Sequence, residues 1–104
     1  DLPPKVVRLE VRVLPSAGDA EGQQRASESG LAHIAGGAQP IPGLGDGAFW
    51  VGGQLDQLHV VSGDTRLIFT VQVAKDPAGA ARRLATKALA RLRALRPLGG
   101  APAQ

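Results

Sequence analysis

Two histidines are the residues of this 104-residue chain best suited to metal binding or proton transfer. His33 and His59 stand far apart in the sequence, and neither has a second histidine or a cysteine at the short spacing typical of zinc sites. A metal ion would need both imidazoles together with Asp56 or Asp64. The simpler interpretation places His33 on a helix and His59 in a strand, each partly exposed at the margin of the core. We therefore expect no metal site.

The segment Gly43–Ala48 matches the pattern G-x-G-x-x-A of dinucleotide-binding loops. Such a loop must follow a buried strand and open a helix, because the helix N-terminus meets the phosphate charge. Prolines precede this segment and Phe49-Trp50-Val51-Gly52-Gly53 follows it, so that context is missing. We interpret it as a structural turn in which glycines allow a tight backbone, a carboxylate caps backbone N–H groups and a tryptophan covers the edge of the core. No cofactor is expected, and the turn residues are Gly43, Gly45, Asp46, Gly47 and Trp50.

Hydroxyl and carboxylate side chains form no recognisable catalytic arrangement. No serine stands in a G-x-S-x-G elbow, and Ser62 fits the turn of a hairpin. Asp56 and Asp64 flank the same hairpin, as turn residues usually do. A catalytic site needs a base, a group that orients it and a pocket. We therefore predict that the protein is not an enzyme.

Positive charge is concentrated at the C-terminal end. Residues 1–76 carry six basic and nine acidic side chains, whereas residues 77–104 carry six basic and no acidic ones. On a helix these cations cover the side away from the apolar residues: Arg82, Arg83, Lys87, Arg91, Arg93 and Arg96. This face either contacts an anionic partner or is a solvated face favoured by the helix dipole. The solvated face is the simpler interpretation. An anionic membrane surface is the alternative partner, and nucleic acid is the least expected one because aromatic stacking residues are lacking.

Composition limits the chain to one small domain. Hydrophobic residues make up 43% of it but aromatic residues only 3%, so aliphatic side chains must fill the core. The absence of cysteine excludes disulfides and thiolate metal sites. All apolar runs are far shorter than the roughly 20 residues that span a membrane.

Local patterns predict the elements of the N-terminal half. In Val6–Leu14, apolar residues alternate with charged ones, which is typical of a strand with one face buried. Asp19–Ala35 has the composition of a helix, with Gly36 and Gly37 positioned to end it. Ala38–Gly53 holds so many glycines and prolines that we expect a turn-rich connector without a long regular element.

The C-terminal half contains a clear hairpin pattern. Gln57–Val61 and Thr65–Ala74 flank Ser62-Gly63-Asp64, which predicts two antiparallel strands joined by a glycine turn. Apolar residues at every second position of the second strand, Phe69 among them, are expected to be buried together. Trp50 is expected to be buried against the C-terminal helix.

A long helix is predicted after the hairpin. Asp76 is expected to cap it, with Pro77 in its first turn, and Pro97 to end it after about Leu95. We therefore predict a single α+β domain over residues 1–96, with an antiparallel β-sheet and helices packed on it. A flexible Pro/Gly/Ala tail over residues 97–104 follows.

Two of these segments resemble a bacterial family. The turn Gly43-Leu44-Gly45-Asp46-Gly47-Ala48-Phe49-Trp50, followed by the hairpin, resembles small exported sensor-like lipoproteins of unknown function with a PsbP-like fold. The helix with Leu84-Ala85, Lys87-Ala88-Leu89 and Leu92 is similar to that family's closing helix. The resemblance covers Val6 to Leu95, and the family's opening helix and first strands have no counterpart here. It implies a PsbP-like antiparallel sheet, no catalytic residues and an extracytoplasmic location, in the periplasm, the cell envelope or the secreted fraction.

Two classes of function are expected from these observations. The first is a non-catalytic cell-envelope domain that binds or accompanies another protein or associates with itself. A family fold without its first half leaves a sheet edge or face uncovered, and such surfaces tend to pair with another chain. The alternative is a basic accessory domain whose C-terminal helix contacts an anionic surface or polymer, such as lipid headgroups or nucleic acid.

Overall fold

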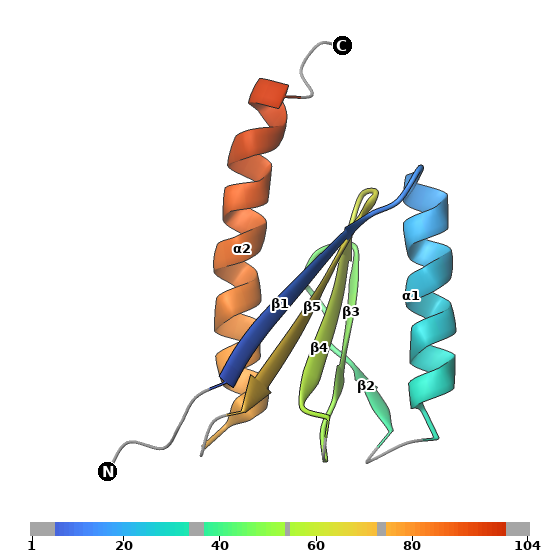
Figure 1. Ribbon diagram of the computed structural model, residues 1–104, viewed down its shortest axis with the longest axis vertical. Helices are drawn as coiled ribbons and strands as arrows, with labels where there is room; N and C mark the ends of the chain where they lie inside the picture. Colours follow the sequence, from blue (N-terminus) through green and yellow to red (C-terminus); the bar gives the residue numbers. More distant parts are fainter. Residues whose placement is uncertain (1–5, 34–36, 54, 73–74, 100–104) are drawn as a thin grey trace.

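The centre of the domain is an antiparallel sheet of five strands in the order β1-β5-β4-β3-β2. The computed structural model describes residues 6–33, 37–53, 55–72 and 75–99. The elements are β1 (Val6–Val13), α1 (Ala17–Leu31), β2 (Ala38–Pro40), β3 (Gly47–Val51), β4 (Gln57–Ser62), β5 (Thr65–Gln72) and α2 (Pro77–Gly99). Figure 1 shows the sheet between the two helices. The predicted α+β class, an antiparallel sheet with helices packed on it, is confirmed.

The hairpin of β4 and β5 forms the middle of the sheet. Its strands pair with Leu58 opposite Phe69 and Ser62 opposite Thr65, so the turn consists of Gly63 and Asp64. Gly63 has a φ of 60°, a conformation that glycine adopts without steric cost. The predicted hairpin is therefore confirmed as far as Gln72, whereas positions 73 and 74 lie outside the described residues.

Both faces of the central strands are buried, because the two helices cover opposite sides. On one face, Leu58, Phe69 and Trp50 form a core with α2, to which the helix contributes Ala81, Ala85 and Leu89. Phe49, Val51 and Val61 point to the other face by the alternation of strand side chains, and all three are buried. The burial predicted for Trp50 is confirmed.

The segment predicted as a turn-rich connector contains two short strands. β3 pairs with β4 along its whole length, and β2 pairs with β3 through three residues. Glycines and prolines do interrupt this segment, but burial of Phe49, Trp50 and Val51 between the helices stabilises β3 nonetheless. Tertiary packing here overrides the local turn signals.

Helix α1 begins and ends earlier than predicted. Ser16 is its N-cap, and its hydroxyl accepts a hydrogen bond of 3.0 Å from the backbone N–H of Asp19. Ala32 is the C-cap, and the glycines expected to end the helix lie beyond it. The helix buries Ala20 and Gln24 rather than its C-terminal apolar residues. A polar side chain thus occupies the centre of its contact with the sheet.

Helix α2 begins as predicted but continues further. The side chain of Asp76 accepts a hydrogen bond of 3.1 Å from the N–H of Gly79, which confirms the cap. The helix passes Pro97 and ends at Gly99, so it includes the first residues of the predicted tail. Proline has a helical φ but no N–H, so the helix loses one hydrogen bond to the carbonyl four residues earlier, near its C-terminal end. No helix in the described ranges is long and apolar enough to cross a membrane.

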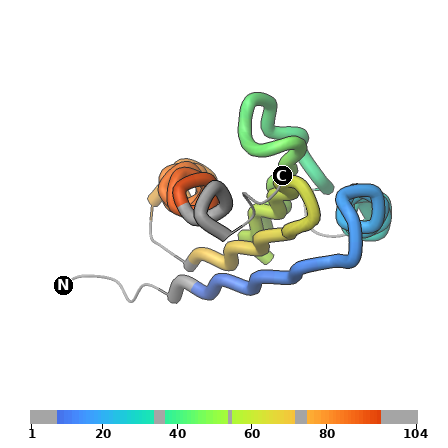
Figure 2. Tube along the Cα trace, turned by 90° about the horizontal axis from the view of Figure 1, so that it is seen from above, coloured from blue at the N-terminus to red at the C-terminus, as the bar shows by residue number. Residues whose placement is uncertain are grey.

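Strand β1 forms as predicted, but its apolar side is not buried. Leu9, Val11 and Val13 are 46%, 54% and 69% exposed. They lie on the sheet face that α2 covers, since Leu9 is opposite Phe69 and Val11 is opposite Leu67. Figure 2 shows that β5 lies between β1 and α2. The helix covers the strands further in and does not reach β1.

Candidate functional site

A polar network is buried between the sheet and α1. Arg66 on β5 is 1% exposed, Gln24 on α1 is 6% exposed and His59 on β4 is 5% exposed. The Nε of Arg66 donates to the Oε1 of Gln24 at 3.0 Å, and a terminal guanidinium nitrogen lies 3.0 Å from Nδ1 of His59. The Nε2 of Gln24 donates to the carbonyl oxygen of His59 at 3.0 Å. The network therefore fastens α1 to both strands of the central hairpin.

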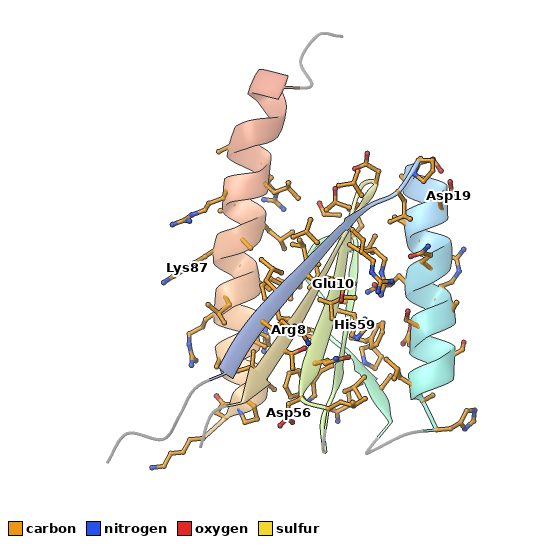
Figure 3. All side chains as sticks on the ribbon, viewed as in Figure 1. Arg8, Glu10, Asp19, Asp56, His59 and Lys87 are labelled. Carbon is orange, nitrogen blue, oxygen red and sulfur yellow. The ribbon has the colours of Figure 1, made fainter. Side chains whose placement is uncertain are left out.

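The guanidinium fixes the tautomer of His59. Arginine only donates hydrogen bonds, so Nδ1 of His59 must accept and the proton resides on Nε2. That Nε2 then donates to Oε1 of Gln57 at 3.0 Å. Phe49 stacks on the imidazole with 4.6 Å between the ring centroids. The sequence interpretation of His59 as a partly exposed residue is wrong, because Phe49 stacks on its ring and α1 covers this side of the sheet. Figure 3 shows His59 on the side of the sheet that faces α1.

The network holds one positive charge without a carboxylate. Among the described residues the one salt bridge joins Arg12 to Glu10 on the surface of β1, at 2.6 Å, and none reaches Arg66. Burial lowers the pKa of Arg66 and the nearby charge of Arg12 lowers it further, while the charge of Glu10 opposes this shift. Burial, followed by the charge of Arg66, also lowers the pKa of His59 from 6.5 to about 4. His59 is therefore neutral at physiological pH.

We expect folding stability to fall as the pH decreases from 7 to 5. Between pH 6.5 and 4 the unfolded chain binds a proton on His59 that the folded chain excludes, so lowering the pH favours unfolding. The loss between pH 7 and pH 5 is about 2 kcal/mol for a pKa that changes from 6.5 to about 4. Urea unfolding at a series of pH values measures it. The variant His59→Gln has no imidazole at this position and should show a flatter dependence; an unchanged slope would assign the effect to other groups.

The polar network attaches α1 to the sheet and, within the residues that the structure describes, leaves no buried polar side chain free to react. In the described part of the chain, every buried side-chain nitrogen or oxygen has a hydrogen-bond partner. No three metal-ligating side chains gather in that part, and His33 is exposed beyond the end of α1. An open pocket of about 360 Å³ lies beside the network, and Glu21, Gln24, Arg25, Glu28 and Phe49 are among the residues that line it.

The glycine turn lies against the end of the central hairpin. The carboxylate of Asp46 accepts a hydrogen bond of 2.7 Å from the N–H of Gly63. The backbone N–H of Asp46 donates to the carbonyl oxygen of Val61. Gly43 and Gly45 both have positive φ. A Cβ on Gly45 would lie 2.7 Å from the carbonyl oxygen of Val61, so this position requires glycine. Gly47 begins β3, and Trp50 belongs to the core against α2.

The basic residues predicted as a contact surface lie on the outer side of α2. Ala81, Ala85 and Leu89 on the opposite side of the helix are buried. The basic residues with exposed side chains are Arg82, Arg83, Lys87, Arg91 and Arg93. Figure 3 shows Lys87 pointing away from the sheet. The side chain of Arg96 lies outside the described residues. The structure thus brings five cations to one exposed helix face.

The outer edge of β1 is the surface that the sequence did not locate. β1 is the terminal strand of the sheet, and within the described ranges β5 is its one partner. The N–H of Leu14 donates to the carbonyl of Asp64 at 2.8 Å. Backbone groups alternate in direction along an antiparallel strand, so even-numbered residues of β1 bond to β5. The N–H and C=O groups of Leu9, Val11 and Val13 therefore point outward.

Comparison with known proteins finds no matching family model, and neither curated proteins nor solved structures give a significant match. What the domain does must therefore be inferred from its own surfaces. Two surfaces stand out: the outer edge of β1 with its exposed apolar side chains, and the basic face of α2.

Proposed function

We propose that this chain is a non-catalytic protein-binding domain whose binding surface is the outer edge of β1. The observation that supports it is that the same three residues combine exposed apolar side chains with outward-pointing backbone groups. Leu9, Val11 and Val13 carry the exposed apolar side chains, and their backbone N–H and C=O groups point away from β5. A strand edge of this kind is a template for a further strand, with backbone hydrogen bonds providing affinity and side chains providing specificity.

The chemistry of the network agrees with a binding rather than a catalytic role. Its donors and acceptors are used to attach α1 to the sheet. Because β1 belongs to a sheet that this attachment makes rigid, its backbone is already extended before a partner binds. This preorganisation reduces the conformational entropy lost on binding. The resemblance of the glycine turn and the closing helix to exported lipoprotein domains supports a place in the cell envelope for this binding function.

The basic face of α2 supports a second candidate function. Its five exposed cations lie on a helix that contains no acidic residue. Contact with an anionic surface, such as lipid headgroups, would use these cations and would weaken as salt screens them. This contact would use α2 rather than β1. Probes placed on the two elements can therefore distinguish the two candidate functions.

Photo-crosslinking in the cells that produce the protein tests both candidates. A benzophenone amino acid is placed either at Val11 or at Ala90, which is exposed on α2. We expect the Val11 probe to yield a discrete protein adduct and the matched Ala90 probe to yield none. Adducts with lipid or nucleic acid from Ala90 alone, with none from Val11, would replace the proposed function by the second candidate.

A further inference from the structure

We propose that the partner of the β1 edge is a second copy of this chain, paired antiparallel about a twofold axis at Val11. The inference rests on the proposed function, since it uses the same edge. It specifies the partner as a second copy of the chain, and it specifies the register in which the two β1 strands pair. The twofold axis runs perpendicular to the sheet, so the two sheets become continuous and both α2 helices lie on the same side.

Backbone direction restricts the possible registers. Leu9, Val11 and Val13 direct their N–H and C=O groups outward, whereas Glu10 and Arg12 direct theirs to β5. In a symmetric pair, outward groups must meet outward groups. The axis can therefore lie at a residue but not between two residues. The four candidate positions are those at or between the exposed residues of β1, leaving out Val13 because it ends the strand: Leu9, Glu10, Val11 and Arg12.

Charge then selects among these four registers. Arg8, Glu10 and Arg12 share the face of β1 opposite the apolar one. An axis at Glu10 or at Arg12 places that residue against its own copy, so that like charges meet. An axis at Val11 places each Glu10 against an Arg12, and an axis at Leu9 places each Arg8 against a Glu10. Opposite charges across a strand pair stabilise it and like charges destabilise it, so the Glu10 and Arg12 registers are disfavoured.

The exposed apolar residues favour the axis at Val11. In that register Val11 faces Val11 and each Leu9 faces a Val13, so all three exposed side chains of β1 contact their counterparts. With the axis at Leu9, Val13 would instead have no counterpart in the other β1, because its partner position would precede Val6, where the strand begins. Val13 is the most exposed of the three at 69% and gains most from an apolar neighbour.

A charge-swap experiment tests the pairing. In Glu10→Arg, both charged contacts of the Val11 register become Arg against Arg, and in Arg12→Glu they become Glu against Glu. We expect each variant alone to have a dimer dissociation constant raised by about tenfold or more. An equimolar mixture should dimerise again, because each charged contact of the mixed dimer joins an arginine of one chain type to a glutamate of the other. Sedimentation equilibrium measures this, and circular dichroism verifies folding of the exposed-site variants.

Single cysteines determine the register independently, since the chain has none of its own. Glu10 and Arg12 form a non-hydrogen-bonded pair in the Val11 register, where Cα atoms lie about 4.5 Å apart and a disulfide can form. We expect a mixture of Glu10→Cys and Arg12→Cys chains to oxidise to a mixed dimer. A dominant mixed dimer of Arg8→Cys with Glu10→Cys, or a Glu10→Cys homodimer, would overturn the Val11 register.

The oligomeric state separates this inference from the proposed function. A chain that sediments as a monomer at millimolar concentration overturns the self-pairing. If its Val11 photoprobe still captures a different protein, the β1 edge remains a binding surface and only the identity of the partner changes. A monomer whose Val11 probe captures no protein overturns both.

Discussion

Replacing Phe69 by alanine is expected to lower the free energy of unfolding by about 3–5 kcal/mol. The ring is 2% exposed and lies in the core that β4, β5 and α2 enclose. Its removal loses apolar burial and leaves a cavity that the paired strands cannot close, because β5 is held between β1 and β4. Urea unfolding followed by the fluorescence of Trp50, the sole tryptophan, measures the change.

Leu9→Ala provides the matched control for this prediction. Leu9 lies directly opposite Phe69 in the register of β1 and β5, on the same sheet face, but is 46% exposed. At concentrations where the chain is monomeric, we expect its truncation to cost less than about 1 kcal/mol. Equal losses for the two variants would contradict the unequal coverage of this face by α2.

Replacing Gln24 by leucine is expected to destabilise the fold by about 3 kcal/mol, because it leaves a buried guanidinium without its acceptor. The Nε of Arg66 loses the Oε1 of Gln24, and the carbonyl of His59 loses a donor. Leucine is similar in size to glutamine, so the loss reports unsatisfied polar groups rather than a cavity. Chemical denaturation at pH 7 measures it.

Two further variants identify the cause of this loss. Gln23→Leu changes the adjacent, exposed residue of α1 in the same way and should have little effect. The double variant Gln24→Leu/Arg66→Met removes the buried charge together with its acceptor and should be more stable than Gln24→Leu alone. A double variant that is less stable would show that Arg66 stabilises the fold without Gln24.

Much of the local structure could be predicted from the sequence. The hairpin of β4 and β5 followed from alternation on either side of Gly63, and the start of α2 followed from Asp76 and Pro77. These features depend on residues close together in the chain, where backbone sterics and capping hydrogen bonds act. An uncovered sheet edge or face was also expected, but only from the resemblance to a family, and no residue pattern indicated that the edge is that of β1.

Tertiary structure alone decided that the apolar side of β1 is exposed and that a polar network is buried. The alternation in β1 predicts two different faces but not whether a helix covers the apolar one, and α2 packs on β5 and β4 while leaving the side chains of β1 exposed. Likewise, Gln24 and Arg66 are 42 positions apart, and no local pattern marks either as buried. Burial of a polar group depends on partners that arrive from other elements, because desolvation is tolerated only where hydrogen bonds replace water. Periodicity therefore determined β1, β4, β5 and α2, whereas packing determined β3, the polar network and the exposed edge of β1.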